Sequence, residues 1–170
     1  TNRLVGSEMC IRDRMIADVD IAMINILDGK NQFTIGGSGI QVDPFLAMPQ
    51  KMSVCQHALL SPEPLIISDL SKDDRFAGSH LTKPPTSARF YAGFPLNTPE
   101  GLVLGTLCAV HQKPLNLNHE QQRLMKQLAK AVTDHILMRN EQTKLTASQV
   151  AAMLGRFVRF APEGTINELI

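Results

Sequence analysis

The chain has 170 residues, of which 44% are hydrophobic, and its 17 lysines and arginines nearly balance 16 aspartates and glutamates. This balance excludes the basic surface that nucleic acids or anionic membranes require, and the apolar content argues against a disordered chain. No apolar run approaches the roughly 18–20 residues that a membrane span needs, and no secretory signal is visible, so we expect one cytoplasmic domain with an appendage.

The first residues do not resemble protein-coding sequence. Leu4–Arg14 reads LVGSEMCIRDR, which resembles a transposase-type sequencing adapter translated in frame. We therefore expect residues 1–14 to be non-native, the natural sequence to begin near Met15 and the true N-terminus to be missing. A native polar tail is the alternative.

The next segment predicts a β-hairpin. Residues 20–28 form a nearly continuous apolar run rich in isoleucine, which is typical of a strand buried on both faces. Asp28 and Gly29 supply a strong turn signal, and Asn31 to Ile35 is the expected partner strand. The glycine-rich residues 36–39 end that strand in a loop.

The middle of the chain predicts short elements and a long connection. Ser53 is a plausible N-cap for a short helix through Leu60. Leu65 to Ile67 is expected to be a short central strand. Residues 68–85 are polar and contain prolines and glycine, and connections of this length are often functional or carry short helices.

The second half predicts another hairpin followed by a long helix. Residues 89–110 read RFYAGFPLNTPEGLVLGTLCAV, in which two apolar arms flank a turn with proline and glycine at residues 97–101. Asn118 and Gln121 have the spacing of a capping box, and the apolar stripe that follows predicts a helix to about Lys144. A second helical pattern starts at Thr146. The order of elements predicts an α+β fold with an antiparallel sheet.

Several motifs resemble bacterial GAF domains, which are small sensor modules of signalling proteins. The resemblance rests on SVCQHA at residues 53–58, PLIISD at 64–69, DDRF at 73–76, FYAGFPL at 90–96 and LGTLC at 104–108, in the order that the family shows. It covers roughly Ile21 to Arg139 and implies a central sheet of about six antiparallel strands with helices on its faces. It also implies a first helix where residues 4–14 stand, so one sheet face is expected to lack its cover.

These observations divide the chain into three parts. Residues 1–14 are the expected non-native segment, residues 15–140 a GAF domain lacking most of its first helix, and residues 141–170 a helical linker with the start of a truncated downstream region. By resemblance, the missing output would be a kinase, a cyclase or a transcription domain.

Residues that could carry catalysis or hold a metal are sparse. Cys55 and His57 lie two apart, so on a helix they point to different sides and do not form a nucleophile and base. Cys55 and Cys108 are too few and too far apart in sequence for a zinc knuckle or a disulfide scaffold, and we expect two buried free thiols. The histidines show no metal-ligand spacing; they are His57, His80, His111, His119 and His135. We expect no catalytic residue and no metal site.

Two ligand modes of the GAF family are not supported by the residues present. Bilin-binding members attach the chromophore through a cysteine upstream of the FYAGFPL-like strand, and residues 79–87 contain none. Members that bind cyclic nucleotides carry an Asn-Lys-x-x-x-Phe…Asp-Glu signature, which residues 113–120 do not reproduce. The enzyme relative, a free-methionine-sulfoxide reductase, uses several cysteines around its pocket, whereas only Cys55 and Cys108 lie outside the expected non-native segment.

We therefore expect a non-catalytic sensor domain that binds an unidentified small molecule, without a cofactor, between the sheet and residues 52–87. The candidate ligand-binding residues are Cys55, His57, Asp69, Arg75, Phe76, Phe90 and Tyr91. The resemblance implies signal output and homodimerisation through the Asn118–Lys144 helix. A ligandless dimerisation module and a thiol-dependent reductase are the alternatives.

Overall fold

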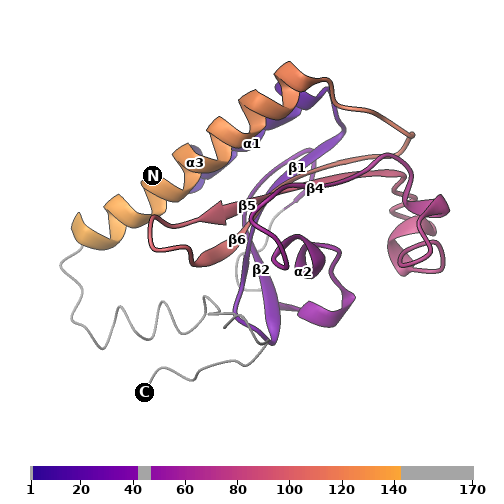
Figure 1. The fold of residues 1–170 in the computed structure, drawn as a ribbon, viewed down its shortest axis with the longest axis horizontal. Coiled ribbons are helices and arrows are strands. Elements are labelled where there is room, and N and C mark those ends of the chain that lie inside the picture. Colours follow the sequence, from indigo (N-terminus) through magenta and orange to yellow (C-terminus); the bar gives the residue numbers. More distant parts are fainter. Residues whose placement is uncertain (1, 42–46, 143–170) are drawn as a thin grey trace.

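The computed structural model describes residues 2–41 and 47–142 as a sheet between two layers of helices and loops (Figure 1). The strands are β1 (Ile21–Leu27), β2 (Asn31–Ser38), β3 (Ala47–Pro49), β4 (Leu65–Ile67), β5 (Phe90–Asn97) and β6 (Val103–His111). Their order in the sheet is β3-β2-β1-β6-β5-β4, with every neighbouring pair antiparallel. The helices are α1 (Asn2–Ala17), α2 (Cys55–Ala58) and α3 (His119–Gln142), with short 3-10 turns at Gln50–Met52, Leu70–Lys72 and His80–Thr82. The predicted α+β fold with a six-stranded antiparallel sheet is confirmed.

The first hairpin forms at the predicted turn. The backbone N–H groups of Lys30 and Asn31 donate to Asp28 Oδ1 at 2.9 and 2.7 Å, and Gly29 has a φ of 86° that glycine adopts at little cost. Strand β2 runs to Ser38, beyond the predicted end at Ile35, because its pairing with β1 continues past a register shift.

The second hairpin and the long helix are also confirmed. Strands β5 and β6 pair along most of their length, and the loop between them closes where Thr98 N–H donates to Leu102 O at 2.8 Å. At the start of α3, Gln121 N–H donates to Asn118 Oδ1 at 2.8 Å, and Asn118 N–H donates to Gln121 Oε1 at 2.9 Å. This reciprocal pair is the predicted capping box. The helical pattern expected from Thr146 lies outside the described residues.

Strand β4 lies at the edge of the sheet and pairs only with β5, so the prediction of a central strand is wrong. Both layers cover it nevertheless. Ile66 packs against the helix-side core, whereas Leu65 and Ile67 belong to the core on the other face. A strand that is covered on both faces has a continuous apolar sequence whether it lies at the edge or in the centre of the sheet. The apolar pattern of β4 therefore could not distinguish the two positions.

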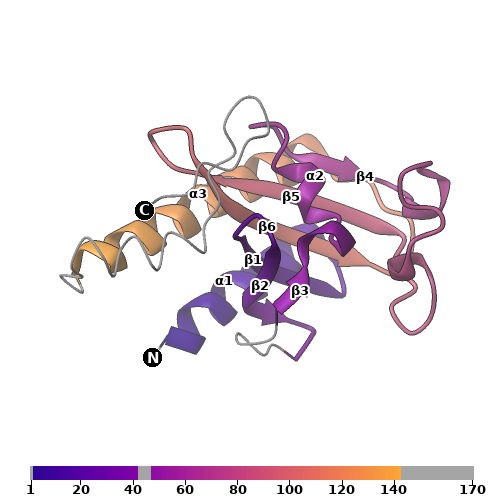
Figure 2. The same cartoon turned by 90° about the horizontal axis from the view of Figure 1, so that it is seen from below.

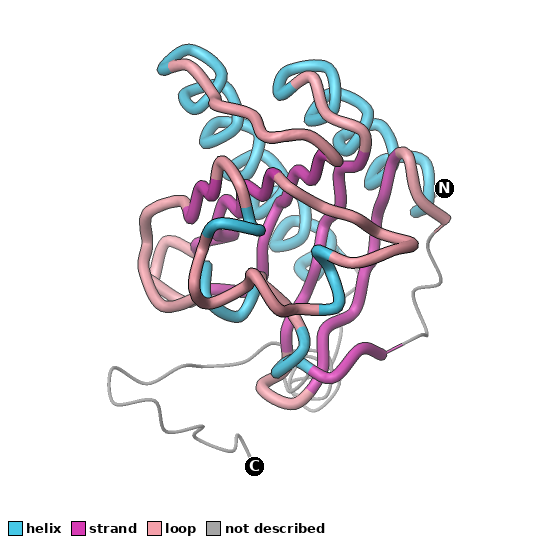
Figure 3. The backbone as a smooth tube through the Cα atoms, turned by 90° about the vertical axis from the view of Figure 1, so that its right-hand side faces the viewer, coloured by secondary structure: helices cyan, strands magenta, loops and turns pink. Residues whose placement is uncertain are grey.

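The expectation of an uncovered sheet face is also wrong. Helices α1 and α3 lie side by side over that face, as the end-on view in Figure 3 shows. Cys10 and Ala17 of α1 are fully buried in this core. Cys10, Asp13 and Ala17 recur at helical spacing, so residues 9–17 have one helix face that packs against the sheet. This holds whether or not the segment is native. Asp13 is fully buried as well, and neither of its carboxylate oxygens has a hydrogen-bond partner.

The opposite face is covered by α2, the 3-10 turns and their loops, which together are called the cover below and lie in front of the sheet in Figure 2. Alternating side chains of the central strands divide between the two layers. Phe90 and Phe94 of β5 point to the helix side, whereas Tyr91 and Cys108 point to the cover. No helix within the described ranges is both long enough and apolar enough to cross a membrane.

Candidate functional site

A cavity of about 310 Å³ lies between the sheet and its cover. Strands β1, β2, β5 and β6 supply its floor. The rest comes from the segments around α2 and the two later 3-10 turns, from β3 and from the loop that follows β2. Among the described residues, the lining contains no Asp, Glu, Lys, Arg or His. The polar lining consists of Asn25, Gln32, Thr34, Gln41, Ser53, Thr86 and Tyr91. The remaining lining is Ile21, Met23, Ile40, Met48, Val54, Cys55, Leu70, Leu81, Ala88 and Val110. Such a site suits a small uncharged molecule.

Asn25 is the polar centre of the floor and is fully buried. Its Nδ2 donates to Cys108 Sγ at 3.0 Å and to Cys55 Sγ at 3.4 Å. Its Oδ1 accepts a hydrogen bond from Thr34 Oγ1 at 2.7 Å. The hydroxyl of Thr34 thus holds the amide in one orientation, with the donor side toward both sulfurs.

A β-bulge sets this arrangement. Asn25 pairs with Thr34 while the preceding residue Ile24 pairs with Gly36, so Ile35 is the extra residue of β2. The bulge resets the register between β1 and β2 and brings the Thr34 hydroxyl beside the Asn25 amide. Ile35 itself is 41% exposed.

Ser53 connects the cover to the floor. Its Oγ accepts the backbone N–H of Cys55 at 3.0 Å and donates to Gln32 Oε1 of β2. The N-cap of α2 is Val54, without a side-chain cap, so the prediction of Ser53 as the N-cap is wrong by one residue. Helix α2 ends at Ala58 and is shorter than predicted. Ser53 and Gln32 are both buried, so this contact fixes the position of Cys55 over the sheet.

Cys55 and Cys108 are buried free thiols, as predicted, but they are neighbours in space. Their Sγ atoms are 4.0 Å apart, although 53 positions separate them in sequence. The hydrogen bond with Cys108 lowers the pKa of Cys55 to about 6 against the opposing effect of burial, and the hydroxyls of Thr106 and Tyr91 add to the lowering. The same hydrogen bond and burial raise the pKa of Cys108 well above its ordinary value.

Tyr91 lines the cavity with a buried hydroxyl that has no hydrogen-bond partner of standard geometry. Burial, together with the nearby thiols, raises its pKa well above the ordinary value, so the hydroxyl stays protonated. Gly93 leaves room for the Tyr91 side chain, because a Cβ at residue 93 would lie 2.4 Å from the Tyr91 hydroxyl oxygen. The Tyr91 hydroxyl contributes to the lowered pKa of Cys55 but makes no hydrogen bond of standard geometry, so it is suited to bind a ligand acceptor.

Three other predicted site residues meet on the cover but do not line the cavity. The rings of His57 and Phe76 meet edge-on, with their centres 5.0 Å apart. The Arg75 guanidinium lies 5.0 Å from the centre of the Phe76 ring. Arg75 also donates to both carboxylate oxygens of Asp73 at 2.9 and 2.7 Å. Burial, followed by the charge of Arg75, lowers the pKa of His57. His57, Arg75 and Phe76 therefore contact one another and Asp73 within the cover, on residues that do not line the cavity.

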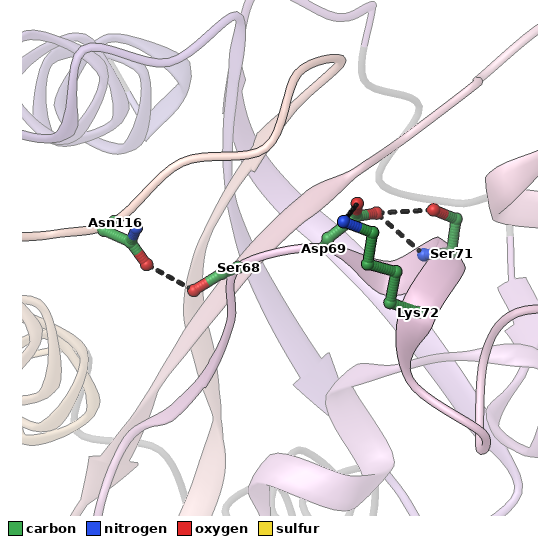
Figure 4. Close-up of polar contacts among 5 residues, drawn as sticks. All are labelled: Ser68, Asp69, Ser71, Lys72 and Asn116. Carbon is green, nitrogen blue, oxygen red and sulfur yellow. Dashed lines mark hydrogen bonds and ion pairs between the residues drawn. The ribbon is translucent and has the colours of Figure 1, made fainter.

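Asp69 also forms its contacts locally, as Figure 4 shows. Its Oδ1 accepts from Ser71 N–H at 3.1 Å and from Ser71 Oγ at 2.6 Å, while Lys72 Nζ is 3.8 Å from its Oδ2. The hydrogen bond from Ser71 is the largest cause of the lowered pKa of Asp69. Beside it, Ser68 donates to Asn116 and ties β4 to the segment before α3.

Phe90 is fully buried in the helix-side core, on the face of the sheet away from the cavity. It is adjacent to Tyr91, and neighbouring residues of a strand point to opposite faces. Of the seven candidate residues, the structure therefore brings Cys55 and Tyr91 together at the cavity. Their role in ligand binding stays a prediction.

Sequence reasoning did not identify Asn25, Thr34 and Gln32 as site residues. One signal was present: Asn25 is the single polar residue inside the apolar run of β1. A buried polar side chain needs a partner and therefore indicates a network. Within the described ranges, His, Cys, Asp and Glu side chains do not gather in groups of three that could hold a metal ion.

Comparison with known proteins agrees with this architecture. Over 94 residues the chain is 35% identical to a cyclic di-GMP phosphodiesterase of Pseudomonas aeruginosa, and the match is 55% of this chain but 16% of that protein. The fold is similar to a GAF domain from a phosphoenolpyruvate-protein phosphotransferase of Coxiella burnetii, with a TM-score of 0.67, 16% identity, and 85% and 84% of the two chains covered.

A second solved structure with a similar fold is the type II free methionine-R-sulfoxide reductase of Thermoplasma acidophilum. Its TM-score is 0.63 at 13% identity, with 78% of this chain and 90% of that chain covered. At such low identity both structural matches establish the fold alone. The GAF domain family itself matches residues 12–136, which is more than half of the sequence. The chain therefore belongs to the GAF domain family.

Proposed function

We propose that this chain is the sensor module of a bacterial signalling protein and that it binds a small, uncharged and largely apolar molecule in the cavity. The observation that carries the proposal is the lining, which combines aliphatic and methionine side chains with neutral amides and hydroxyls. Most of its polar groups are engaged with one another, as in the Asn25–Thr34 and Ser53–Gln32 contacts. The Tyr91 hydroxyl remains as the donor for a ligand acceptor.

The uncharged lining argues against a nucleotide ligand. Phosphates bind where arginine, lysine or a helix N-terminus offsets their charge, and burying them without such a group is unfavourable. Arg75 does not line the cavity and is paired with Asp73. The relative named a cyclic di-GMP phosphodiesterase shares a segment that is 16% of its length, and we do not extend its substrate to this cavity.

Signal output is proposed to pass through the sheet to α3. Strands β5 and β6 present Tyr91 and Val110 to the cavity, and their opposite faces pack against α3. Ligand contacts that shift these strands would therefore reach the helix through directly packed side chains.

We further propose that α3 pairs with a second copy of the chain. Met125, Ala129 and Val132 are buried in the core, but Met138 near the end of the described helix is 57% exposed. The C-terminal end of α3 extends past the sheet in Figure 1. Sedimentation equilibrium should give twice the chain mass, and Met138→Glu should shift the equilibrium toward the monomer. A wild-type protein that stays monomeric at high concentration would contradict the dimer.

Residues 4–14 are proposed to be non-native even though they form part of α1. The buried and unpartnered carboxylate of Asp13 supports this, because an evolved core seldom buries such a group without a partner. Sequencing the encoding locus from intact genomic DNA tests the proposal. Recovery of the same eleven codons would contradict it.

The binding proposal is tested with N-phenyl-1-naphthylamine, an uncharged dye whose fluorescence rises in apolar surroundings. We expect saturable binding to the wild-type chain and loss of binding in Val110→Phe, which adds a ring within the cavity. Val103→Phe is the matched control, because Val103 lies on the same strand and is also half-buried but does not line the cavity. Cyclic AMP should not displace the dye. Equal binding by the two variants would contradict the site, and absence of saturable binding would favour the ligandless dimerisation module.

A further inference from the structure

We propose that Cys55 of α2 and Cys108 of β6 form a two-thiol oxidation site where the cover of the cavity meets the sheet, and that a small neutral hydroperoxide converts them to a disulfide. The inference goes beyond ligand sensing and does not depend on which molecule the cavity binds. It rests on the position of the two sulfurs, on the amide between them and on the route by which a reagent reaches them.

The two sulfurs have different positions relative to the cavity. Cys55 is 4% exposed and lines the cavity, whereas Cys108 is fully buried on β6 behind it. Their Sγ atoms are 4.0 Å apart, and a disulfide bond is about 2.05 Å long. Closing this gap requires the sulfurs to approach by about 2 Å. The geometry therefore makes Cys55 the sulfur that meets the oxidant and Cys108 the sulfur that resolves the product.

Asn25 positions both thiols. Its Nδ2 donates to each sulfur, at 3.4 Å to Cys55 and 3.0 Å to Cys108, and Thr34 prevents the amide from turning over. A donor of this kind stabilises a thiolate more than a thiol. The lowered pKa of Cys55 has a different cause, chiefly its hydrogen bond with Cys108. The unpartnered hydroxyl of Tyr91 stands beside the same sulfur and can donate to an oxygen that leaves during the reaction.

The reaction balances with one hydroperoxide for each pair of thiols. The Cys55 thiolate attacks the terminal oxygen of the hydroperoxide, so that an S–O bond forms, the O–O bond breaks and an alcohol leaves with the proton of the original thiol. Cys108 then attacks Sγ of the Cys55 sulfenic acid; the S–S bond forms, the S–O bond breaks and water leaves with the proton of Cys108. The two sulfurs lose two electrons, which reduce the O–O bond.

The cavity selects the class of oxidant. A reagent reaches Cys55 across a lining without charged side chains, and transfer of a charged molecule into such a site is unfavourable. Neutral alkyl hydroperoxides meet this condition, whereas zwitterionic methionine sulfoxide does not. Cys10, the third buried thiol, lies in the core on the opposite face of the sheet and does not line the cavity. It therefore serves as an internal control.

The test uses the full chain, reduced and freed of reductant, with tert-butyl hydroperoxide as the probe. We expect a mass loss of two hydrogens, loss of two titratable thiols and one cross-linked peptide pair that joins Cys55 to Cys108. Cys10→Ser should give the same result. Oxidation at Cys10 before the pair, or oxidation of the pair without a cross-link, would overturn the proposal.

Two variants assign the order of events and allow for a failure to fold. Cys108→Ser should stop at a sulfenic acid on Cys55 that dimedone traps, whereas Cys55→Ser should leave Cys108 reduced. Tyr91→Phe should slow the reaction several-fold without changing the product. Circular dichroism verifies folding, and the wild-type cross-link stands independently of any variant. Disulfide formation with free methionine sulfoxide in place of the hydroperoxide would also overturn the proposal, in favour of a reductase.

Discussion

Replacing Asp13 by asparagine should stabilise the chain at neutral pH. Asp13 is fully buried against the sheet, and both oxygens lack a hydrogen-bond partner. Burial raises the pKa of its carboxyl well above the ordinary value of 3.8. Asparagine keeps nearly the same shape and cannot ionise, so it removes the cost of holding this carboxyl protonated.

The expected gain depends on pH. Below about pH 4 the carboxyl is protonated in both the folded and the unfolded chain, so the two proteins should differ little. Above this pH the unfolded chain releases its proton while the folded chain retains it, and wild-type stability falls until the pH reaches the raised pKa. At 1.36 kcal/mol per pH unit, the penalty at pH 7 cannot exceed about 4 kcal/mol. The asparagine amide is also a buried polar group, so the cost of an unpaired polar group is common to both proteins. The gain at pH 7 comes from ionisation alone, and we expect it to reach at most about 4 kcal/mol.

Urea unfolding followed by circular dichroism at pH 4 and pH 7 measures this difference. Asp74→Asn is the matched control, because Asp74 is exposed and its replacement should change the free energy of unfolding by less than about 0.5 kcal/mol. An Asp13→Asn protein that is less stable than the wild type at pH 7 would show that the buried carboxyl does not destabilise the chain. A difference of equal size at both pH values would show that ionisation of Asp13 is not the cause.

Three further predictions concern the core, the long helix and the thiol pair. Phe94→Ala removes a fully buried ring from the helix-side core and should lower the free energy of unfolding by about 3–5 kcal/mol in guanidinium titrations; a loss below 1 kcal/mol would contradict the packing. Asn118→Ala removes the cap of α3 and should cost about 1 kcal/mol by the same measurement, whereas an unchanged midpoint would contradict the cap. Alkylation of Cys55 by iodoacetamide should rise with pH to a midpoint near 6, because the thiolate is the reactive form and its neighbours Cys108 and Tyr91 remain protonated there; a midpoint near 8.5 would contradict the lowered pKa.

Much of the fold could be predicted because local signals determine it. The turn at Asp28–Gly29, the capping box at Asn118 and the proline-glycine turn before Leu102 each depend on a few adjacent residues, and each forms as expected. The position of β4 depends instead on pairing between distant segments. Its three residues are apolar on both faces, so local sequence carries no information on which strand lies beside it.

The cavity could be predicted only in part for the same reason. Cys55 was expected at the site because the short helix lies in the predicted cover, but its contact with Cys108 joins residues 53 positions apart. The contact between Asn25 and Thr34 depends on a one-residue bulge, and the apolar pattern of β2 does not reveal it. Phe90 and Tyr91 are equally aromatic, and only the register of β5 decides which of them faces the cavity.

Hydrogen–deuterium exchange with and without N-phenyl-1-naphthylamine reports both where an uncharged ligand binds and whether α3 responds. We predict slower exchange in residues 53–55 and in β1, β5 and β6, which line the cavity, together with a change in α3 on the opposite face of the sheet. Saturable dye binding with no change in these strands would contradict this prediction, because the ligand would then lie elsewhere on the domain.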